Sequence, residues 1–263
     1  VYKRQLQTTA VWRKLPKDWA VQLAACCQRA NDAASDPTTV FFRADDVAVP
    51  GQQFRRLMEI FTRNEVPLGL AVVPAWLTSP RWQALSSMGA SRPDLWCWHQ
   101  HGWRHRNHEP EGKKQEFGPF RPADALRADL ERGRQRLTVI MGATFSPLFT
   151  PPWNRCSEIT LALLQEMGYA AVSRSRGSQP PAPSGLPDHA VDVDLHTDRA
   201  PSAASGWQHL IDQLEKSLGR PRCGIMIHHQ RMNDAAFCFL DTLLGILRQQ
   251  RRLHMADMRD LPI

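Results

Sequence analysis

The stretch that decides the fold is TVFFRADD at residues 39–46, where an apolar run ends in two carboxylates. Its β-branched and aromatic residues are typical of a buried strand. Asp45 and Asp46 stand at its end. Apolar residues at helical spacing predict a helix on either side, at 18–33 and 50–64. This unit, a buried strand with polar residues at its end and a helix nearby, recurs along the chain.

Strands and helices alternate over most of the 263 residues. Such alternation predicts right-handed βαβ units and a mostly parallel sheet. Neither G-x-G-x-x-G nor a P-loop is present, which argues against a nucleotide-binding fold. About seven β-α units fit a closed or nearly closed α/β barrel. The expected strands are 39–44, 66–74, 94–99, 145–149, 169–173, 190–193, 223–227 and 253–255, and the expected helices are 18–33, 50–64, 80–88, 123–141, 157–167, 202–218 and 235–250.

Polar side chains collect where these predicted strands end. The carboxyl ends of parallel strands lie at one face of a barrel, and α/β barrels carry their chemistry there. We therefore expect these side chains to form one site. They are Asp45 and Asp46, His101 and His105, the segment 150–154, Asp192 and Asp194, and His228 and His229.

His101 and His105 are four residues apart in WHQHGWRHRNH at residues 98–108. If this segment coils as a helical turn, both imidazoles lie on one face, as two ligands of one metal ion require. A solvated basic loop is the alternative, because Arg104 and Arg106 interleave with the histidines.

Asp45 and Asp46 need a reason to lie together, since like charges in a poorly solvated site repel. A divalent cation supplies one, and an N-cap and turn before the helix at 50–64 is the alternative. One Asp with two His forms an open three-ligand set that suits Zn²⁺ first, with Co²⁺, Ni²⁺ or Mn²⁺ as further candidates. Such an ion lowers the pKa of its water towards ~7 and polarises a carbonyl. Amide hydrolysis also needs a base, for which Asp45 is the candidate, and an acid, which is His228 or His229.

With these residues in place, the chain resembles the polysaccharide deacetylase superfamily, of the NodB-homology or carbohydrate esterase 4 type. The resemblance covers roughly residues 38–256 and implies a distorted (β/α)7 barrel with its site at the C-terminal strand ends. It also implies a metal-dependent enzyme that removes an N-acetyl or related acyl group from an amino sugar or polysaccharide. The matching motifs, in order, are Arg43-Ala44-Asp45-Asp46, His101-Gly102-Trp103-Arg104-His105, Pro151-Pro152-Trp153 and Ile225-Met226-Ile227-His228.

The resemblance further implies a role for each residue. Asp45 is the catalytic base and His228 the catalytic acid, while Asp46, His101 and His105 hold the metal. Met226 or Ile227 lines the acyl pocket, and a nearby backbone N–H helps to hold the oxyanion. Substrate contacts fall to Pro151, Pro152, Trp153, Asn154, Trp103, Met226 and His229.

Several positions depart from the family pattern. Thr150 stands where an arginine usually braces the base, and Arg43 or Arg155 is the candidate substitute. The departures indicate a divergent member whose substrate is open, and they allow the two adjacent histidines to exchange roles. The others are Ala44 for a common Phe, His229 for a common Asp, and Asp192-Val193-Asp194 for Asp-x-x-Asp-Trp.

The formal charge is +7, and the basic residues are dispersed rather than gathered in a nucleic-acid-binding block. This charge suits an acidic polymer or a lipid-linked phosphate as substrate. The resemblance implies an acylated amino sugar that is polymeric or linked to a lipid or nucleotide. No apolar run reaches the length of about 18 residues that a membrane span needs. Six cysteines without a C-x-x-C pair favour a reducing compartment, so we expect a cytoplasmic rather than a secreted protein. The expected parts are an N-terminal segment at 1–37, with a helix packed on the barrel, and a catalytic domain at 38–263.

Two other functions stay open at this point. One is a deformylase or amidohydrolase of a lipid-linked or small-molecule substrate. The other is a catalytically silent carbohydrate-binding barrel, for which loss of the bracing arginine would be a first step. Of the remaining histidines, His99 and His108 are expected to orient ligands or lie at the surface, and surface positions are expected for His189, His196, His209 and His254.

Overall fold

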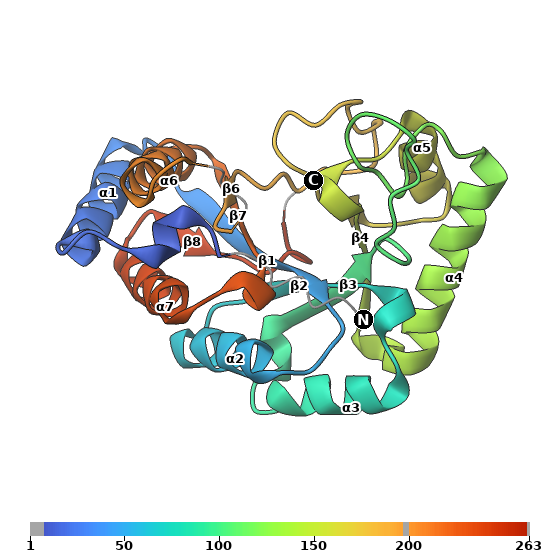
Figure 1. The fold of residues 1–263 in the computed structure, drawn as a ribbon, viewed down its shortest axis with the longest axis horizontal. Helices are drawn as coiled ribbons and strands as arrows, with labels where there is room; N and C mark the ends of the chain where they lie inside the picture. The colour runs from blue at the N-terminus through green and yellow to red at the C-terminus, as the bar shows by residue number, and fades with distance from the viewer. Residues whose placement is uncertain (1–7, 197–199, 262–263) are drawn as a thin grey trace.

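The centre of the molecule is a curled parallel sheet in the computed structural model, which describes residues 8–196 and 200–261 (Figure 1). In these residues the strand order is β5-β4-β3-β2-β1-β7-β6, and β8 pairs with the start of β1. The predicted distorted α/β barrel is therefore confirmed. Its strands are β1 (Thr38–Val47), β2 (Leu68–Val72), β3 (Trp96–His101), β4 (Phe145–Thr150), β5 (Ala171–Val172), β6 (Val193–Asp194), β7 (Arg222–Ile227) and β8 (Leu253–Met255).

Helices surround this sheet, with α1 outside α6 at one edge (Figure 1). The predicted helices and strands are present, most of them with shifted ends, and the strand expected at 190–193 is reduced to Val193 and Asp194. The division into 1–37 and 38–263 stays a prediction, although α1 does pack against α6 and α7. The helices are α1 (Trp19–Ala33), α2 (Gln52–Asn64), α3 (Ser79–Met88), α4 (Ala123–Met141), α5 (Glu158–Glu166), α6 (Ala203–Leu218) and α7 (Asp234–Gln249).

The gap between β5 and β6 is bridged by an irregular segment rather than by a regular strand. Val191 donates its N–H to the Arg174 carbonyl at 2.7 Å, and the next residue, Asp192, donates to the Gly224 carbonyl of β7 at 2.7 Å. The strand expected at 190–193 is therefore mostly this bridge, and only Val193 and Asp194 form β6. The curled sheet thus closes without a continuous ladder.

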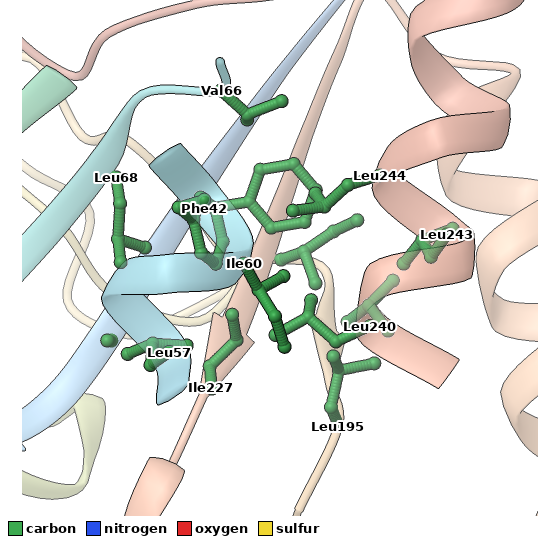
Figure 2. Close-up of a cluster of buried hydrophobic side chains, with 14 of the residues drawn as sticks. Phe42, Leu57, Ile60, Val66, Leu68, Leu195, Ile227, Leu240, Leu243 and Leu244 are labelled. Atoms are coloured by element: carbon green, nitrogen blue, oxygen red, sulfur yellow. The ribbon is translucent and has the colours of Figure 1, made fainter. Parts of the chain in front are cut away.

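Alternate residues of β1 face different surroundings, which decides where the site lies. Phe42 packs in the core between the sheet and the helices, among residues of α2 and α7 (Figure 2). Phe41 lies in a smaller core inside the curled sheet. Arg43 and Asp45 share this inward face, because strand side chains alternate. The register of β1 therefore sends both charged side chains into the barrel.

Two histidine predictions are wrong. His189 and His196 are buried rather than at the surface. His189 packs edge-on against Phe41, and His196 lies beside Trp12. Both follow short irregular segments with no apolar periodicity, so no pattern indicated their burial. His209 and His254 are exposed, as predicted.

No helix within 8–196 and 200–261 is both long and apolar enough to cross a membrane.

Candidate active site

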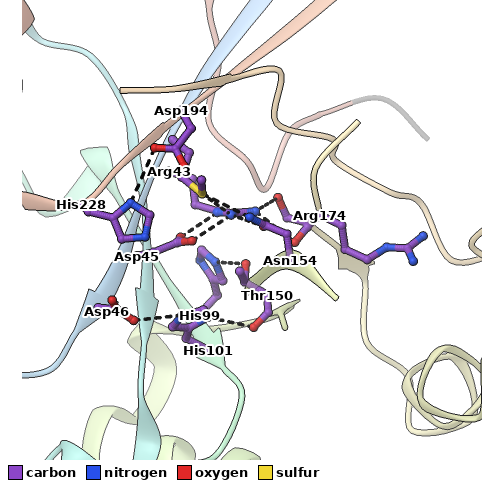
Figure 3. Close-up of polar contacts among 12 residues, drawn as sticks. Arg43, Asp45, Asp46, His99, His101, Thr150, Asn154, Arg174, Asp194 and His228 are labelled. Atoms are coloured by element: carbon purple, nitrogen blue, oxygen red, sulfur yellow. Dashed lines mark hydrogen bonds and ion pairs between the residues drawn. The ribbon is translucent and has the colours of Figure 1, made fainter. Parts of the chain in front are cut away.

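The three predicted metal ligands, Asp46, His101 and His105, converge at the ends of β1 and β3. Figure 3 shows two of them, with Asp46 facing His101. Asp46 Oδ1 lies 3.3 Å from His101 Nε2 and 3.1 Å from His105 Nε2. Asp46 has a left-handed backbone, with φ 60°, which turns its side chain away from that of Asp45. Asp46 Oδ1 is buried and has no hydrogen-bond partner among the described residues. An open carboxylate oxygen facing two imidazole nitrogens is a donor set that fits a divalent metal.

His101 and His105 do not lie on a helical turn, so that interpretation of their spacing is wrong. The chain leaves β3 through Gly102, at φ 56°, and His105 itself has φ 56°. The buried Glu116 carboxylate accepts backbone N–H groups from Trp103 at 3.0 Å, Arg104 at 2.7 Å and Arg106 at 3.3 Å. A Cβ on Gly102 would lie 2.2 Å from Glu116 Oε2, so the residue there must be glycine. Glu116 is a residue that sequence reasoning missed.

The protein orients the ligands through their other atoms. His101 Nδ1 lies 3.0 Å from the Thr150 carbonyl, so it carries the proton and leaves Nε2 facing Asp46. Burial would lower the pKa of His101, but Asp46 and Asp45 outweigh it and the pKa is raised. Burial and the nearby His101 lower the pKa of His105 to about 4. Burial opposes ionisation of Asp46, yet His101 and His105 hold its pKa below the ordinary value.

Asp45 is paired with Arg43, which takes the place of the arginine missing at Thr150. Arg43 Nε donates to Asp45 Oδ1 at 2.8 Å and Nη2 donates to Oδ2 at 2.9 Å. The guanidinium is fully buried and also donates to the side chains of Ser173 and Asn154, at 2.7 and 2.6 Å. Burial would raise the pKa of Asp45, but Arg43, His101 and His228 outweigh it and keep the carboxyl ionised.

The guanidinium of Arg155, the other candidate for this role, donates to the Lys114 carbonyl at 3.5 Å rather than to Asp45. Thr150 itself has a different task, because its hydroxyl lies 3.0 Å from His99 Nε2 and its carbonyl meets His101. Burial lowers the pKa of His99 to about 3, so His99 is a neutral support beneath the site.

His228 and His229 have different surroundings. His228 Nδ1 lies 3.8 Å from Asp194 Oδ1, on the same side as Asp45 (Figure 3). The adjacent His229 is buried against the Phe54 ring, 5.4 Å between centroids, and burial lowers its pKa to about 3. The geometry therefore favours His228 over His229 for proton transfer. Of the loosely matched acidic pair, Asp194 is the residue beside His228.

The other predicted substrate residues lie around this centre with mixed exposure. Pro151 and Pro152 are buried, whereas Trp103, Trp153 and Asn154 are partly exposed. The Trp153 ring lies edge-on to His105, with centroids 4.5 Å apart. Met226 Sδ lies 2.9 Å from Arg43 Nη2, inside the sheet. Ile227 instead belongs to the core between sheet and helices, so it does not line the site. Their contacts with substrate stay predictions.

This arrangement is the polysaccharide deacetylase fold, and comparison with solved structures bears it out. A protein from Mycobacterium smegmatis described as a polysaccharide deacetylase is 15% identical over 86% of this chain and 92% of that one, with a TM-score of 0.63. The peptidoglycan deacetylase PdaC from Bacillus subtilis is 12% identical over 86% and 89%, with a TM-score of 0.52. A CE4 family pseudoenzyme from Bacillus anthracis is 12% identical over 86% and 66%, with a TM-score of 0.54.

No family model matches the sequence, and the search of curated proteins gave no match. The resemblance predicted from the motifs is confirmed at the level of the fold. One of these neighbours is a pseudoenzyme, so the fold alone does not decide activity. Activity must therefore be inferred from the side chains of this protein.

Proposed function

We propose that this protein is a metal-dependent hydrolase that removes an acetyl or related acyl group from the amide nitrogen of an amino sugar. The observation that carries the proposal is the position of the paired Asp45 carboxylate beside the triad of Asp46, His101 and His105. A hydrolase of this class needs an ionised base next to a metal, and the contacts with Arg43 keep Asp45 ionised.

Each residue has a separate task in this proposal. Asp46, His101 and His105 would hold the ion, which supplies Lewis-acid polarisation of the acyl carbonyl and a more acidic water. Asp45 takes the proton of the attacking water. Arg43 holds the Asp45 carboxylate in place and compensates its charge. His228 then gives a proton to the leaving nitrogen, and the Asp194 carboxylate, 3.8 Å from His228 Nδ1, faces the imidazole from its other side.

The substrate is proposed at the level of chemical class, an acylated amino sugar that is polymeric or linked to a lipid or nucleotide. Partly exposed tryptophans beside His105 support a sugar ring as the bound group, because aromatic faces pack on apolar ring surfaces. These side chains are Trp76 and Trp153. Zn²⁺ is the first ion to test, because an Asp with two His suits it.

Asp45→Asn tests the proposal. Loss of the base should lower acetate release from N-acetylated chito-oligosaccharides by about 10²–10⁴-fold. Bound metal, measured by elemental analysis, should stay at the wild-type level because Asp45 is not a ligand. Asp94→Asn, at an exposed ion pair with Arg92, is the matched control and should leave both readings unchanged.

Wild-type turnover by Asp45→Asn would refute the assigned mechanism. Release of formate in place of acetate would favour the deformylase alternative. Metal binding without turnover of any acylated sugar would favour a catalytically silent binding barrel.

A further inference from the structure

A segment outside the deacetylase motifs is attached to the proton-transfer side of the site. Trp12 lies in the short 3-10 helix η1 (Ala10–Arg13), and only 1% of its surface is exposed. Its indole Nε1 donates to the Leu195 carbonyl at 2.7 Å. Its own carbonyl accepts from Asn233 Nδ2 at 2.7 Å. Trp12 therefore joins the end of β6 to the start of α7.

The residues on either side of Leu195 both hold His228. Asp194 Oδ1 lies 3.8 Å from His228 Nδ1. His196 Nδ1 accepts the backbone N–H of His228 at 3.2 Å. The segment 194–196 thus contacts both the side chain and the backbone of His228. Trp12 donates its hydrogen bond to Leu195, which lies between the two contacting residues.

The distance between the Asp194 carboxylate and the His228 ring makes the position of Asp194 critical. The 3.8 Å separation is about 1 Å longer than an ordinary N–H···O hydrogen bond. His228 Nδ1 is buried and makes no hydrogen bond within the described part of the chain. A small displacement of Asp194 therefore decides whether the imidazole is oriented by a carboxylate.

We propose that Trp12 is a positioning residue for the proton donor His228, acting through the Leu195 carbonyl to hold Asp194 and His196 in place. The N-terminal segment is then part of the catalytic apparatus of the barrel. The predicted effect of Trp12 on turnover rests on the proposed function. The predicted effect of Trp12 on the His228 ring does not depend on that function.

Trp12→Phe is the direct test in the full chain loaded with Zn²⁺. It keeps an aromatic ring beside Phe239 and His196 but removes the indole donor. We expect kcat to fall by about tenfold to a hundredfold with KM unchanged, because misplacement of about 1 Å costs that much. We also expect the ratio of the two neutral tautomers of the His228 ring, read from ¹⁵N chemical shifts, to differ from that of the wild type. Trp19→Phe is the control, since Trp19 also packs on Phe239 and, among the described residues, makes no hydrogen bond or ring contact with 194–196.

Asn233→Asp supplies a second variant in case Trp12→Phe does not fold. Asp keeps the oxygen that caps α7 through the Ala236 N–H, but it loses the donor to the Trp12 carbonyl. A lower kcat and a changed tautomer ratio of His228 in this variant support the proposal. An unchanged His228 tautomer in both variants overturns it. If the wild type turns over no acylated sugar, the proposed function fails, and the ¹⁵N result alone decides this inference.

Discussion

The metal side and the base side of the site are held in opposite ways. On the metal side, Asp46 Oδ1 is buried without a hydrogen-bond donor and faces two imidazole nitrogens at 3.1 and 3.3 Å. On the base side, both oxygens of the neighbouring Asp45 are paired with one guanidinium. The alternation of β1 and the left-handed backbone of Asp46 send two consecutive carboxylates into these two environments.

This difference shows what each carboxylate needs. A ligand must keep a lone pair available, so the protein leaves an oxygen of Asp46 open. A base must stay ionised where burial favours the neutral acid, so the protein surrounds Asp45 with donors. The base side therefore depends on a buried charge, whereas the metal side depends on how its loop is held. The two sides should respond differently to substitution.

Arg43→Met should have the largest effect, and it falls on the base side. It leaves Asp45 as a buried charge without a partner, which costs about 3–5 kcal/mol of unfolding free energy. The carboxyl should also take up a proton near neutral pH, so turnover should be lost. Urea denaturation followed by tryptophan fluorescence measures the first effect, and acetate release measures the second.

Two further variants separate the effect of the unpaired charge on stability from the effect of the lost side-chain volume. In Arg43→Met with Asp45→Asn, no buried charge is left, so most of the stability should return while activity stays absent. Arg155→Met, which removes the other candidate arginine, should change stability by less than about 0.5 kcal/mol. Equal losses in Arg43→Met and Arg155→Met would contradict the base-side assignment.

Much of the fold and part of the candidate site could be predicted from the sequence. The longer strands are mostly buried and rich in apolar residues and most helices are amphipathic, so local patterns indicated them. The meeting of Asp46 with His101 and His105 was predictable too, because parallel strands end at the same face of a barrel. The shared face of Arg43 and Asp45 was not predicted, because the expected strand ended at residue 44 whereas β1 continues to Val47.

The rest depends on contacts between residues that are distant in the sequence. His105 reaches Asp46 through a loop stabilised by Glu116, and a single glutamate in a loop carries no periodic signal. Whether Arg43 or Arg155 supports the base depended on burial, which the motif did not reveal. The burial of His196 depended on Trp12, whose segment lies outside every recognised motif.

The protein should also lose stability in acid through the buried His229, which is next to His228 in the chain but is not the proton donor. Burial lowers the pKa of His229 to about 3, below the value of about 6.5 in the unfolded chain. Its contribution is complete above the unfolded value and is lost as the pH falls from about 6.5 towards 3. Between about pH 7.5 and pH 5 this loss is about 2 kcal/mol. Urea denaturation at the two pH values measures it.

His229→Phe should remove this part of the acid sensitivity, because Phe has no charge at either pH. His254→Phe, at an exposed position of β8, is the control and should lose as much stability as the wild type. The assignment is wrong if His229→Phe and the wild type lose the same amount.

Glu116→Gln should have the smallest effect, and it falls on the metal side alone. Gln keeps one acceptor oxygen, so at least one of the backbone N–H groups of Trp103, Arg104 and Arg106 loses its partner. The loop that carries His105 then loosens, and Zn²⁺ affinity should fall by about tenfold, as for other groups that support a metal ligand. Competition with a chelator measures the affinity, and kcat at saturating Zn²⁺ should stay close to wild type.

Glu111→Gln is the control, because it removes the same charge from the exposed part of this loop. Any difference in Zn²⁺ affinity between the two variants therefore reports the loss of the hydrogen bonds to Glu116. An equal loss of affinity in both would mean that Glu116 acts through its charge and not by holding the loop.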